Sequence, residues 1–112
     1  MMRFYKLNED GSVQLANDLE EAFLERTNNQ LGDSTYGPFR ISTVFLGLDH
    51  NYSGKGLPVL FETMVFDNRV ESWIDLHCSR CCTYEEAEKM HFDTIKWVIK
   101  NYDRLLKESM LL

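Results

Sequence analysis

Titratable side chains interrupt or border the apolar segments of this chain, where ionised groups are uncommon. Asp49 and His50 directly follow one apolar segment, and Glu62 interrupts a second. His91 belongs to a third, in which apolar residues recur at helical spacing. A carboxylate inside a buried strand is costly unless it is paired or hydrogen-bonded. Glu62 therefore needs a partner. The candidates are His91, His50 and Arg80.

These groups support three interpretations, which the sequence leaves open. They can form a structural pair that is buried within the fold, or they can form a ligand-binding site. The third interpretation is a hydrolytic metal centre built from Asp49, His50, Glu62 and His91. The spacings typical of metal sites, such as His-x-x-x-His, His-Glu-x-x-His or Asp-x-Asp, do not occur around these residues.

The polar segment 49–56 joins two apolar runs and carries groups that can hold a phosphate and a base. Gly54-Lys55-Gly56 offers backbone amides and a cation, and Tyr52 offers an aromatic face. The segment lacks the Gly-x-x-x-x-Gly-Lys-Ser/Thr order of nucleotide-hydrolysing loops. A simple turn is therefore the alternative interpretation.

We predict an anion-accepting site in which Arg80, Lys55 and His50 bind the charged group. Tyr52 or Tyr84 would stack on a base. The full predicted ligand-binding set is Asp49, His50, Tyr52, Lys55, Glu62, Arg80, Tyr84 and His91. No nucleophile-elbow motif is present, so we predict no catalytic residue, no metal ligand and no cofactor.

Three cysteines, Cys78, Cys81 and Cys82, lie close together in the sequence. An odd number in one short stretch is a poor disulfide framework, and reduced thiols fit an intracellular protein better. In an extended segment Cys78 and Cys82 would share one face and Cys81 the other, so the three could not converge on one metal ion without a bend. We expect small, buried or half-buried apolar residues.

The elements that must position these groups begin with a small hairpin. Phe4–Leu7 is expected to form a strand, Asp10-Gly11 a tight turn and Val13–Leu15 the returning strand. A helix is predicted over about 18–28, because an asparagine cap is followed by apolar residues at helical spacing. Residues 29–39 contain two glycines and a proline without hydrophobic periodicity, which predicts a loop.

Three further segments predict strands, over about 40–48, 57–66 and 70–78. The first two resemble a hairpin with a long loop, and the third alternates as a strand does when one face meets water. The first two segments are too apolar for strands that expose one face to water.

Thr83 and Glu86 form a capping box at the start of a helix predicted over about 84–108. Its apolar stripe consists of Ala87, His91, Ile95, Val98, Tyr102 and Leu105. This stripe must lie on the sheet. We therefore predict an α+β fold in which an antiparallel sheet of three to four strands is covered by this C-terminal helix, with the short N-terminal hairpin and helix beside it.

The chain has 112 residues, 44% of them hydrophobic, and its 12 Lys and Arg against 18 Asp and Glu give a net charge of −6. This length supports one core, so we predict a single domain over 1–112. No run approaches the ~18 apolar residues of a membrane span, and no apolar leader begins the chain, which favours an intracellular protein. The acidic balance argues against direct nucleic-acid binding but permits an inhibitor that presents carboxylates to a basic partner.

Much of the chain resembles a family of small proteins encoded by tailed phages and prophages. The resemblance is carried by Ile41–Tyr52, Pro58–Phe66, Arg80, Thr83–Ala87 and His91, together with the opening from Phe4-Tyr5 to Asp10-Gly11. It implies a phage protein that acts in the cytoplasm of the bacterial host. Family members often have an aromatic residue where this chain has Cys81, which argues against a cysteine-based metal site.

Three classes of function follow as expectations. The favoured class is a non-enzymatic phage protein that counteracts bacterial defence by sequestering a small nucleotide signal in a pocket. The first alternative is a protein-surface inhibitor of a host defence complex, similar to anti-CRISPR proteins, with an acidic or aromatic outer face. The second alternative is a small metal-dependent hydrolase. Binding is favoured because the chain carries no catalytic motif.

The sequence also predicts a homodimer or larger homo-oligomer. The segment Leu105–Leu112 places apolar residues on more than one face after the sheet is already covered. Exposed apolar surface of this kind usually seeks a partner.

Overall fold

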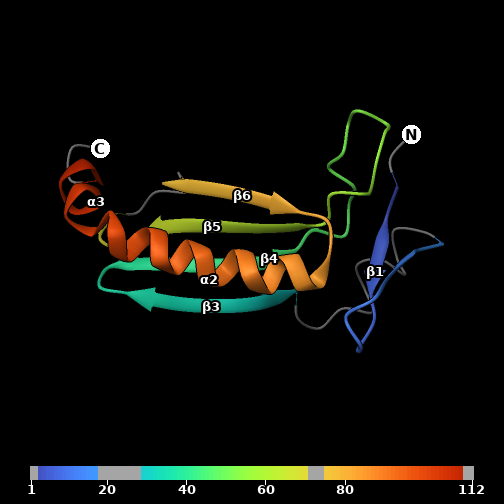
Figure 1. Ribbon diagram of the computed structural model, residues 1–112, viewed down its shortest axis with the longest axis horizontal. Helices are drawn as coiled ribbons and strands as arrows, with labels where there is room; N and C mark the ends of the chain where they lie inside the picture. The colour runs from blue at the N-terminus through green and yellow to red at the C-terminus, as the bar shows by residue number, and fades with distance from the viewer. Residues whose placement is uncertain (1–2, 18–28, 71–74, 110–112) are drawn as a thin grey trace.

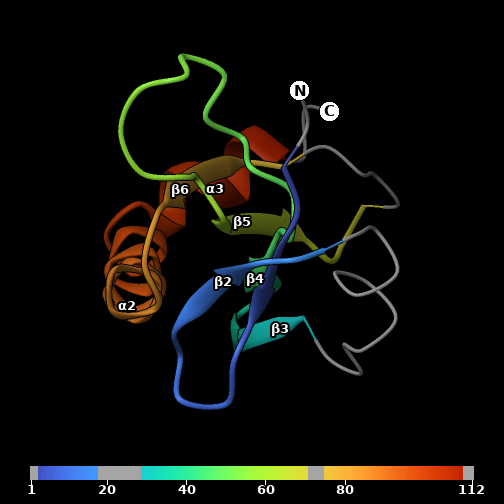
Figure 2. The same cartoon turned by 90° about the vertical axis from the view of Figure 1, so that its right-hand side faces the viewer.

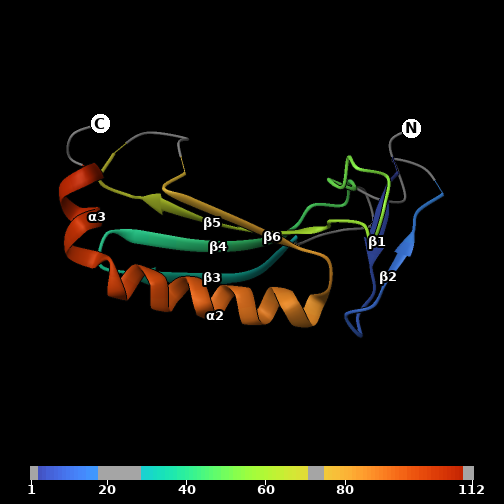
Figure 3. The same cartoon turned by 45° about the horizontal axis from the view of Figure 1, so that its top comes forward.

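The computed structural model of the chain describes residues 3–17, 29–70 and 75–109. Within these ranges the chain forms a two-stranded hairpin, a four-stranded antiparallel sheet and two C-terminal helices (Figure 1). The predicted α+β fold is confirmed. The hairpin lies at one end of the larger sheet and the last helix at the other (Figures 1 and 3).

The hairpin forms as its sequence predicts. Strand β1 (Tyr5–Leu7) pairs antiparallel with β2 (Val13–Leu15). Asp10 supports the turn, because its carboxylate accepts hydrogen bonds from the Ser12 backbone N–H and the Ser12 hydroxyl at 2.9 and 2.6 Å. The helix predicted over 18–28 lies outside the described residues.

The larger sheet has the strand order β3-β4-β5-β6, with every neighbouring pair antiparallel. The strands are β3 (Gln30–Tyr36), β4 (Phe39–Phe45), β5 (Phe61–Asp67) and β6 (His77–Cys81). The three predicted strands are present, but their ends differ from 40–48, 57–66 and 70–78. The long connection leaves the sheet after Phe45 and returns at Phe61. The last strand spans His77–Cys81 and shares only residues 77 and 78 with the predicted 70–78, and residues 71–74 of that prediction lie outside the described residues.

The prediction of a loop over 29–39 is wrong, because most of this segment forms β3. Backbone pairing with β4 makes it a strand, and its polar residues are tolerated at an edge of the sheet that one neighbour covers. Gly37 and Pro38, which suggested a loop, form only the short turn between β3 and β4. Gly37 adopts a φ of +58° and makes the tight turn into β4.

The predicted C-terminal helix is present as two helices, α2 (Tyr84–Lys100) and α3 (Tyr102–Ser109). The expected capping box is confirmed, since Thr83 and Glu86 exchange side-chain to backbone hydrogen bonds of 3.1 Å each. The break comes at Asn101, whose side-chain amide donates to the Trp97 carbonyl at 2.8 Å. Neither described helix combines the length and apolar character that crossing a lipid bilayer demands.

Helix α2 covers one face of the sheet, and the core lies between them (Figure 3). One buried cluster consists of Phe39, Ile41, Val65, Val98 and Leu105. A second consists of Phe45, Leu60, Phe61 and Ala87, and side chains of the hairpin pack against it. Leu105 is part of the core, as its place on the predicted apolar stripe implies, so it is not among the exposed apolar residues expected of the C-terminal segment.

Candidate functional site

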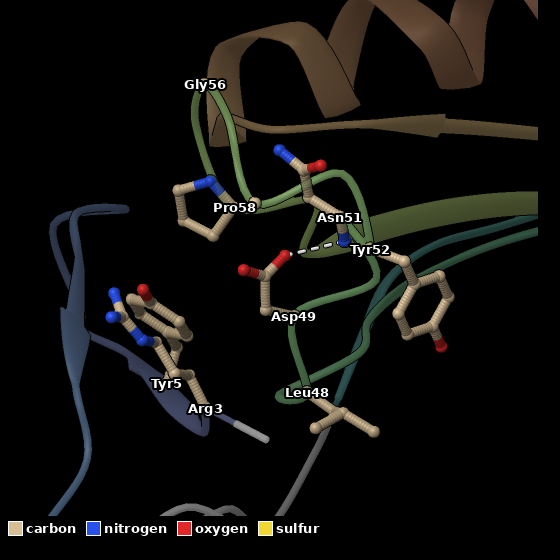
Figure 4. A pocket seen from close by; sticks show the side chains of 9 residues that line it. Arg3, Tyr5, Leu48, Asp49, Asn51, Tyr52, Gly56 and Pro58 are labelled. Atoms are coloured by element: carbon tan, nitrogen blue, oxygen red, sulfur yellow. Dashed lines mark hydrogen bonds between the residues drawn. The ribbon is translucent and has the colours of Figure 1, made fainter. Parts of the chain in front are cut away.

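A pocket lies where β1 meets the long connection between β4 and β5. The backbone of β1 is bonded directly to the start of this connection, from Tyr5 N–H to Gly47 O at 2.7 Å and from Asp49 N–H to Arg3 O at 3.0 Å. Phe4 and Leu48 form an isolated antiparallel bridge between them. Figure 2 shows the hairpin beside the connection. The N-terminal segment therefore supplies one wall of the pocket and the connection supplies the other (Figure 4).

The wall formed by the connection is held in shape by its own polar side chains. One carboxylate oxygen of Asp49 accepts hydrogen bonds from the backbone N–H groups of Asn51 and Val59, at 2.7 and 2.9 Å. The side-chain amide of Asn51 donates to the carbonyls of Lys55 and Leu57 at 2.6 and 2.9 Å. These hydrogen bonds hold the segment in a defined conformation.

We call this cavity the loop pocket. Its volume is about 610 Å³, and it is lined by Arg3, Tyr5, Leu48, Asp49, Asn51, Tyr52, Gly54, Gly56 and Pro58. Figure 4 shows Asp49 between Arg3 and Tyr5 on one side and Tyr52 on the other, with Arg3 just before β1 and Tyr5 at its start. The volume falls within the range of sites that take drug-sized ligands.

Several polar groups of the loop pocket are available to a ligand. Among the described residues, the Arg3 guanidinium has no hydrogen bond or ion pair, and the second carboxylate oxygen of Asp49 has no donor. The backbone N–H groups of Gly54 and Gly56 also have no acceptor among the described residues. Apart from Gly54 and its chain neighbours, no described atom lies within 4 Å of the position that a Cβ atom on Gly54 would occupy. The pocket thus combines a cation, a carboxylate, amide donors and two tyrosine rings.

The structure brings only part of the predicted ligand set to this pocket. Asp49 and Tyr52 line it, and Lys55 lies on the same loop without lining it. The His50 imidazole turns back to its own strand end, where Nδ1 lies 2.7 Å from the Leu48 carbonyl oxygen. Tyr84 is partly buried and packs against Phe61, with ring centroids 6.4 Å apart, and it does not line the pocket.

Glu62 and Arg80 form an ion pair that does not line the loop pocket. Arg80 Nε lies 2.8 Å from Glu62 Oε2, on the face of the sheet opposite α2. Glu62 is only 7% exposed, whereas the Arg80 side chain is 43% exposed. The side-chain hydrogen bond from Arg80 satisfies the buried carboxylate and raises the pKa of the guanidinium, and Tyr52 of the pocket is near enough to Arg80 to help raise that pKa. Of the three candidate partners for Glu62, Arg80 is therefore the one the structure selects.

His91 lies on the other face, beneath α2, in a chain of hydroxyl groups. Its Nε2 is 2.9 Å from Ser34 Oγ, and its Nδ1 is 2.7 Å from Thr43 Oγ1. Thr43 Oγ1 is in turn 2.5 Å from Thr63 Oγ1. Burial lowers the pKa of His91, and the nearby Asp33 carboxylate opposes that shift. A neutral imidazole, with one donor and one acceptor, satisfies both hydroxyl neighbours.

The expectation that Asp49, His50, Glu62 and His91 approach one region is wrong. Successive strand residues point to opposite faces, so Glu62 lies across the sheet from the Thr43–His91 contact. Asp49 and His50 belong to the loop beyond the end of β4. In the described ranges, no three His, Cys, Asp or Glu side chains are grouped so that they could hold a metal ion. The four residues considered for a metal centre are therefore not brought together.

The prediction of buried or half-buried cysteines holds for Cys81 and Cys82 but is wrong for Cys78, which is exposed. Cys78, Cys81 and Cys82 are all free thiols, exposed in the first case and half-buried in the others. Cys81 packs against the second core cluster, and burial raises its pKa to about 11. Such a thiol stays protonated near neutral pH and is a poor nucleophile.

Sequence reasoning missed Arg3 and Tyr5 as site residues. Both precede or open a strand that was predicted correctly, but no local pattern indicates where a two-stranded hairpin docks. One signal was available. The second edge of a two-stranded hairpin needs hydrogen-bond partners, and here residues 47–49 provide them.

Comparison of the chain with protein-family models, with curated proteins and with solved structures finds no significant match in any of the three.

Proposed function

We propose that this protein is a non-enzymatic, phage-type binding protein that counteracts bacterial defence by sequestering a small nucleotide signal in the loop pocket. Its place of action would be the cytoplasm of the bacterial host. The phage setting and the role against defence rest on the sequence resemblance. The ligand class rests on the chemistry of the pocket, and on one observation above all: an unpaired arginine in a cavity of about 610 Å³ that also presents tyrosine rings.

Each part of a nucleotide has a counterpart in the pocket. The Arg3 guanidinium and the free amides of Gly54 and Gly56 suit phosphate oxygens. The exposed Tyr52 ring offers a surface on which a base can stack. Tyr5 also lines the pocket, and its ring packs in part against the second core cluster. The open oxygen of Asp49 can accept hydrogen bonds from ribose hydroxyls or from an exocyclic amine.

The carboxylate of Asp49 also narrows the ligand class. A carboxylate in the same pocket repels a bare anion such as inorganic phosphate. A ligand that offers both an anionic group and hydrogen-bond donors is favoured by the pair Arg3 and Asp49. This requirement fits a nucleotide better than an inorganic anion or a simple carboxylic acid.

Calorimetric titration against linear and cyclic nucleotides and ADP-ribose derivatives tests the ligand class. At least one compound should bind, and Arg3→Gln should weaken its binding about ten- to a hundredfold, since a charge-assisted hydrogen bond contributes roughly 1.5–3 kcal/mol. Arg104→Gln is the matched control, because Arg104 lies on the exposed surface of α3 far from the pocket. Binding that survives Arg3→Gln unchanged would contradict the assignment of the loop pocket.

The biological role is tested separately, in bacteria that carry a nucleotide-signalled defence system. Expression of the parent protein should restore phage growth, and expression of Arg3→Gln should not. Restoration by both proteins would instead favour the alternative of a protein-surface inhibitor, which needs no pocket.

A further inference from the structure

The strand β3 has one edge that no described strand pairs with. β3 stands first in the sheet order β3-β4-β5-β6, and its seven residues contain no lysine or proline. Lysine and proline are common devices that prevent a strand edge from pairing with another chain. The backbone groups on this edge are therefore a template for an added strand.

Apolar side chains of α2 stand beside the same edge. Phe92 is 66% exposed, Ile99 is 47% exposed, and Tyr36 at the end of β3 is 40% exposed. Phe92 helps to line a hollow of about 130 Å³ together with Leu31 and Gly32 of β3, so this side of α2 adjoins the edge strand. Ile99 follows seven residues later on the same helix face. The outer edge of β3, which no described strand pairs with, and this row of exposed apolar groups thus form one surface.

The charges on α2 are arranged about Phe92 with opposite signs. Glu85 and Glu88 precede it, and Lys96 and Lys100 follow it. Within the described ranges, Glu88 and Lys96 take part in no ion pair. A second copy related by a two-fold axis would run its α2 antiparallel to the first. Glu88 of each copy would then lie opposite Lys96 of the other, so the surface is complementary to itself in charge.

The residues of β3 are also complementary to themselves in one register. An antiparallel pairing centred on Ser34 would place Asp33 opposite Thr35, a carboxylate opposite a hydroxyl, and would avoid an Asp33–Asp33 contact. The same register would place Tyr36 of each copy opposite Gly32 of the other. An aromatic ring that covers a strand glycine is a favourable cross-strand pair. It would fill the hollow beside Phe92.

From these observations we propose that two copies of this chain associate through β3 and the adjoining side of α2, forming a continuous eight-stranded sheet with both α2 helices on one face. This surface takes the place of the C-terminal segment as the basis of a homodimer, because Leu105 is buried in the core of its own chain. The loop pocket is lined by β1 and the connection between β4 and β5, so it is not part of the contact.

Sedimentation velocity across a concentration series tests the dimer. The parent protein should be dimeric, and Phe92→Glu should raise the dissociation constant at least about tenfold, since buried aromatic anchors carry much of the energy of an interface. Leu57→Glu is the matched control, because Leu57 is 62% exposed in the connection between β4 and β5, outside the proposed contact. Circular dichroism checks that each variant keeps its fold. A parent that sediments as a monomer at every concentration would overturn the proposal.

A charge exchange tests the antiparallel arrangement itself. Glu88→Lys should weaken the dimer, because the substituted side chain would bring a positive charge opposite Lys96 of the other copy. The double variant with Glu88→Lys and Lys96→Glu should associate as the parent does, since opposite charges would face each other again. A double variant as weak as Glu88→Lys alone would contradict the proposed pairing of the two helices.

Discussion

Glu62 forms an ion pair with Arg80, and the two side chains differ sharply in solvent exposure. The carboxylate is almost fully buried, whereas the Arg80 side chain that satisfies it lies nearly half in water. Breaking a fully buried pair costs several kcal/mol, but an exposed partner is screened by solvent and can be replaced in part by water. The position therefore contributes to stability with a moderate magnitude, and it lies outside the loop pocket.

Glu62→Gln should lower the free energy of unfolding by about 1–2 kcal/mol, because the charge is lost while the volume and one acceptor remain. Ligand binding should not change. Urea denaturation measures the effect. Asp93→Asn serves as the control, since Asp93 forms an exposed pair with Lys89 and should cost less than about 0.5 kcal/mol. A Glu62→Gln protein as stable as the parent that binds no nucleotide would show that Glu62 belongs to the site.

His91 should make the stability of the fold depend on pH. Its pKa in the folded protein is lowered from the ordinary 6.5 by burial. The unfolded chain therefore takes up a proton on this residue that the folded chain resists, so stability is complete above about pH 6.5 and declines as the pH falls below that value. In His91→Gln, the decline in unfolding free energy between about pH 7 and pH 5 should be smaller than in the parent. Equal declines in the two proteins would contradict the assignment.

At the scale of the elements, the strands and helices that carry strong periodicity follow from the sequence, and those decided by their neighbours do not. β4 and β5 are apolar and β-branched, and the start of α2 has a capping box, so each was predicted. β3 has no hydrophobic pattern of its own and becomes a strand through pairing with β4. The end of α2 depends on a side-chain contact at Asn101 that no propensity indicates.

The turn between β3 and β4 offers a test of how these elements meet. Gly37 has a positive φ, and a methyl group added there would collide with the Tyr102 hydroxyl of α3. Gly37→Ala should therefore cost about 1–3 kcal/mol, from backbone strain and from displacement of the Tyr102 ring. Gly54→Ala is the control: its φ is also positive, but the surrounding space is open, so it should cost only about 1 kcal/mol. Equal unfolding free energies for the two variants would show that the contact with Tyr102 is unimportant.

At the scale of the whole molecule, the candidate site combines segments that the sequence keeps far apart. Asp49 and Tyr52 could be selected from the sequence because they lie in a polar, glycine-containing loop between two strands. Arg3 and Tyr5 could not, because their place depends on how the hairpin docks against residues 47–49. The fold also separates groups that the sequence suggested were neighbours. The sheet lies between Glu62 and His91, and Tyr84 does not line the loop pocket.

The most direct test of the central claim is an amide-resolved NMR titration of the isotope-labelled protein with the nucleotide that binds best in the calorimetric series. The loop pocket predicts that the largest shift changes occur at the backbone amides of Asn51, Gly54 and Gly56 and at the Arg3 side chain. The amides of α3, at the opposite end of the sheet from the hairpin, should remain nearly unchanged. Saturable changes centred on the Glu62–Arg80 ion pair, or no saturable change with any nucleotide, would contradict the account.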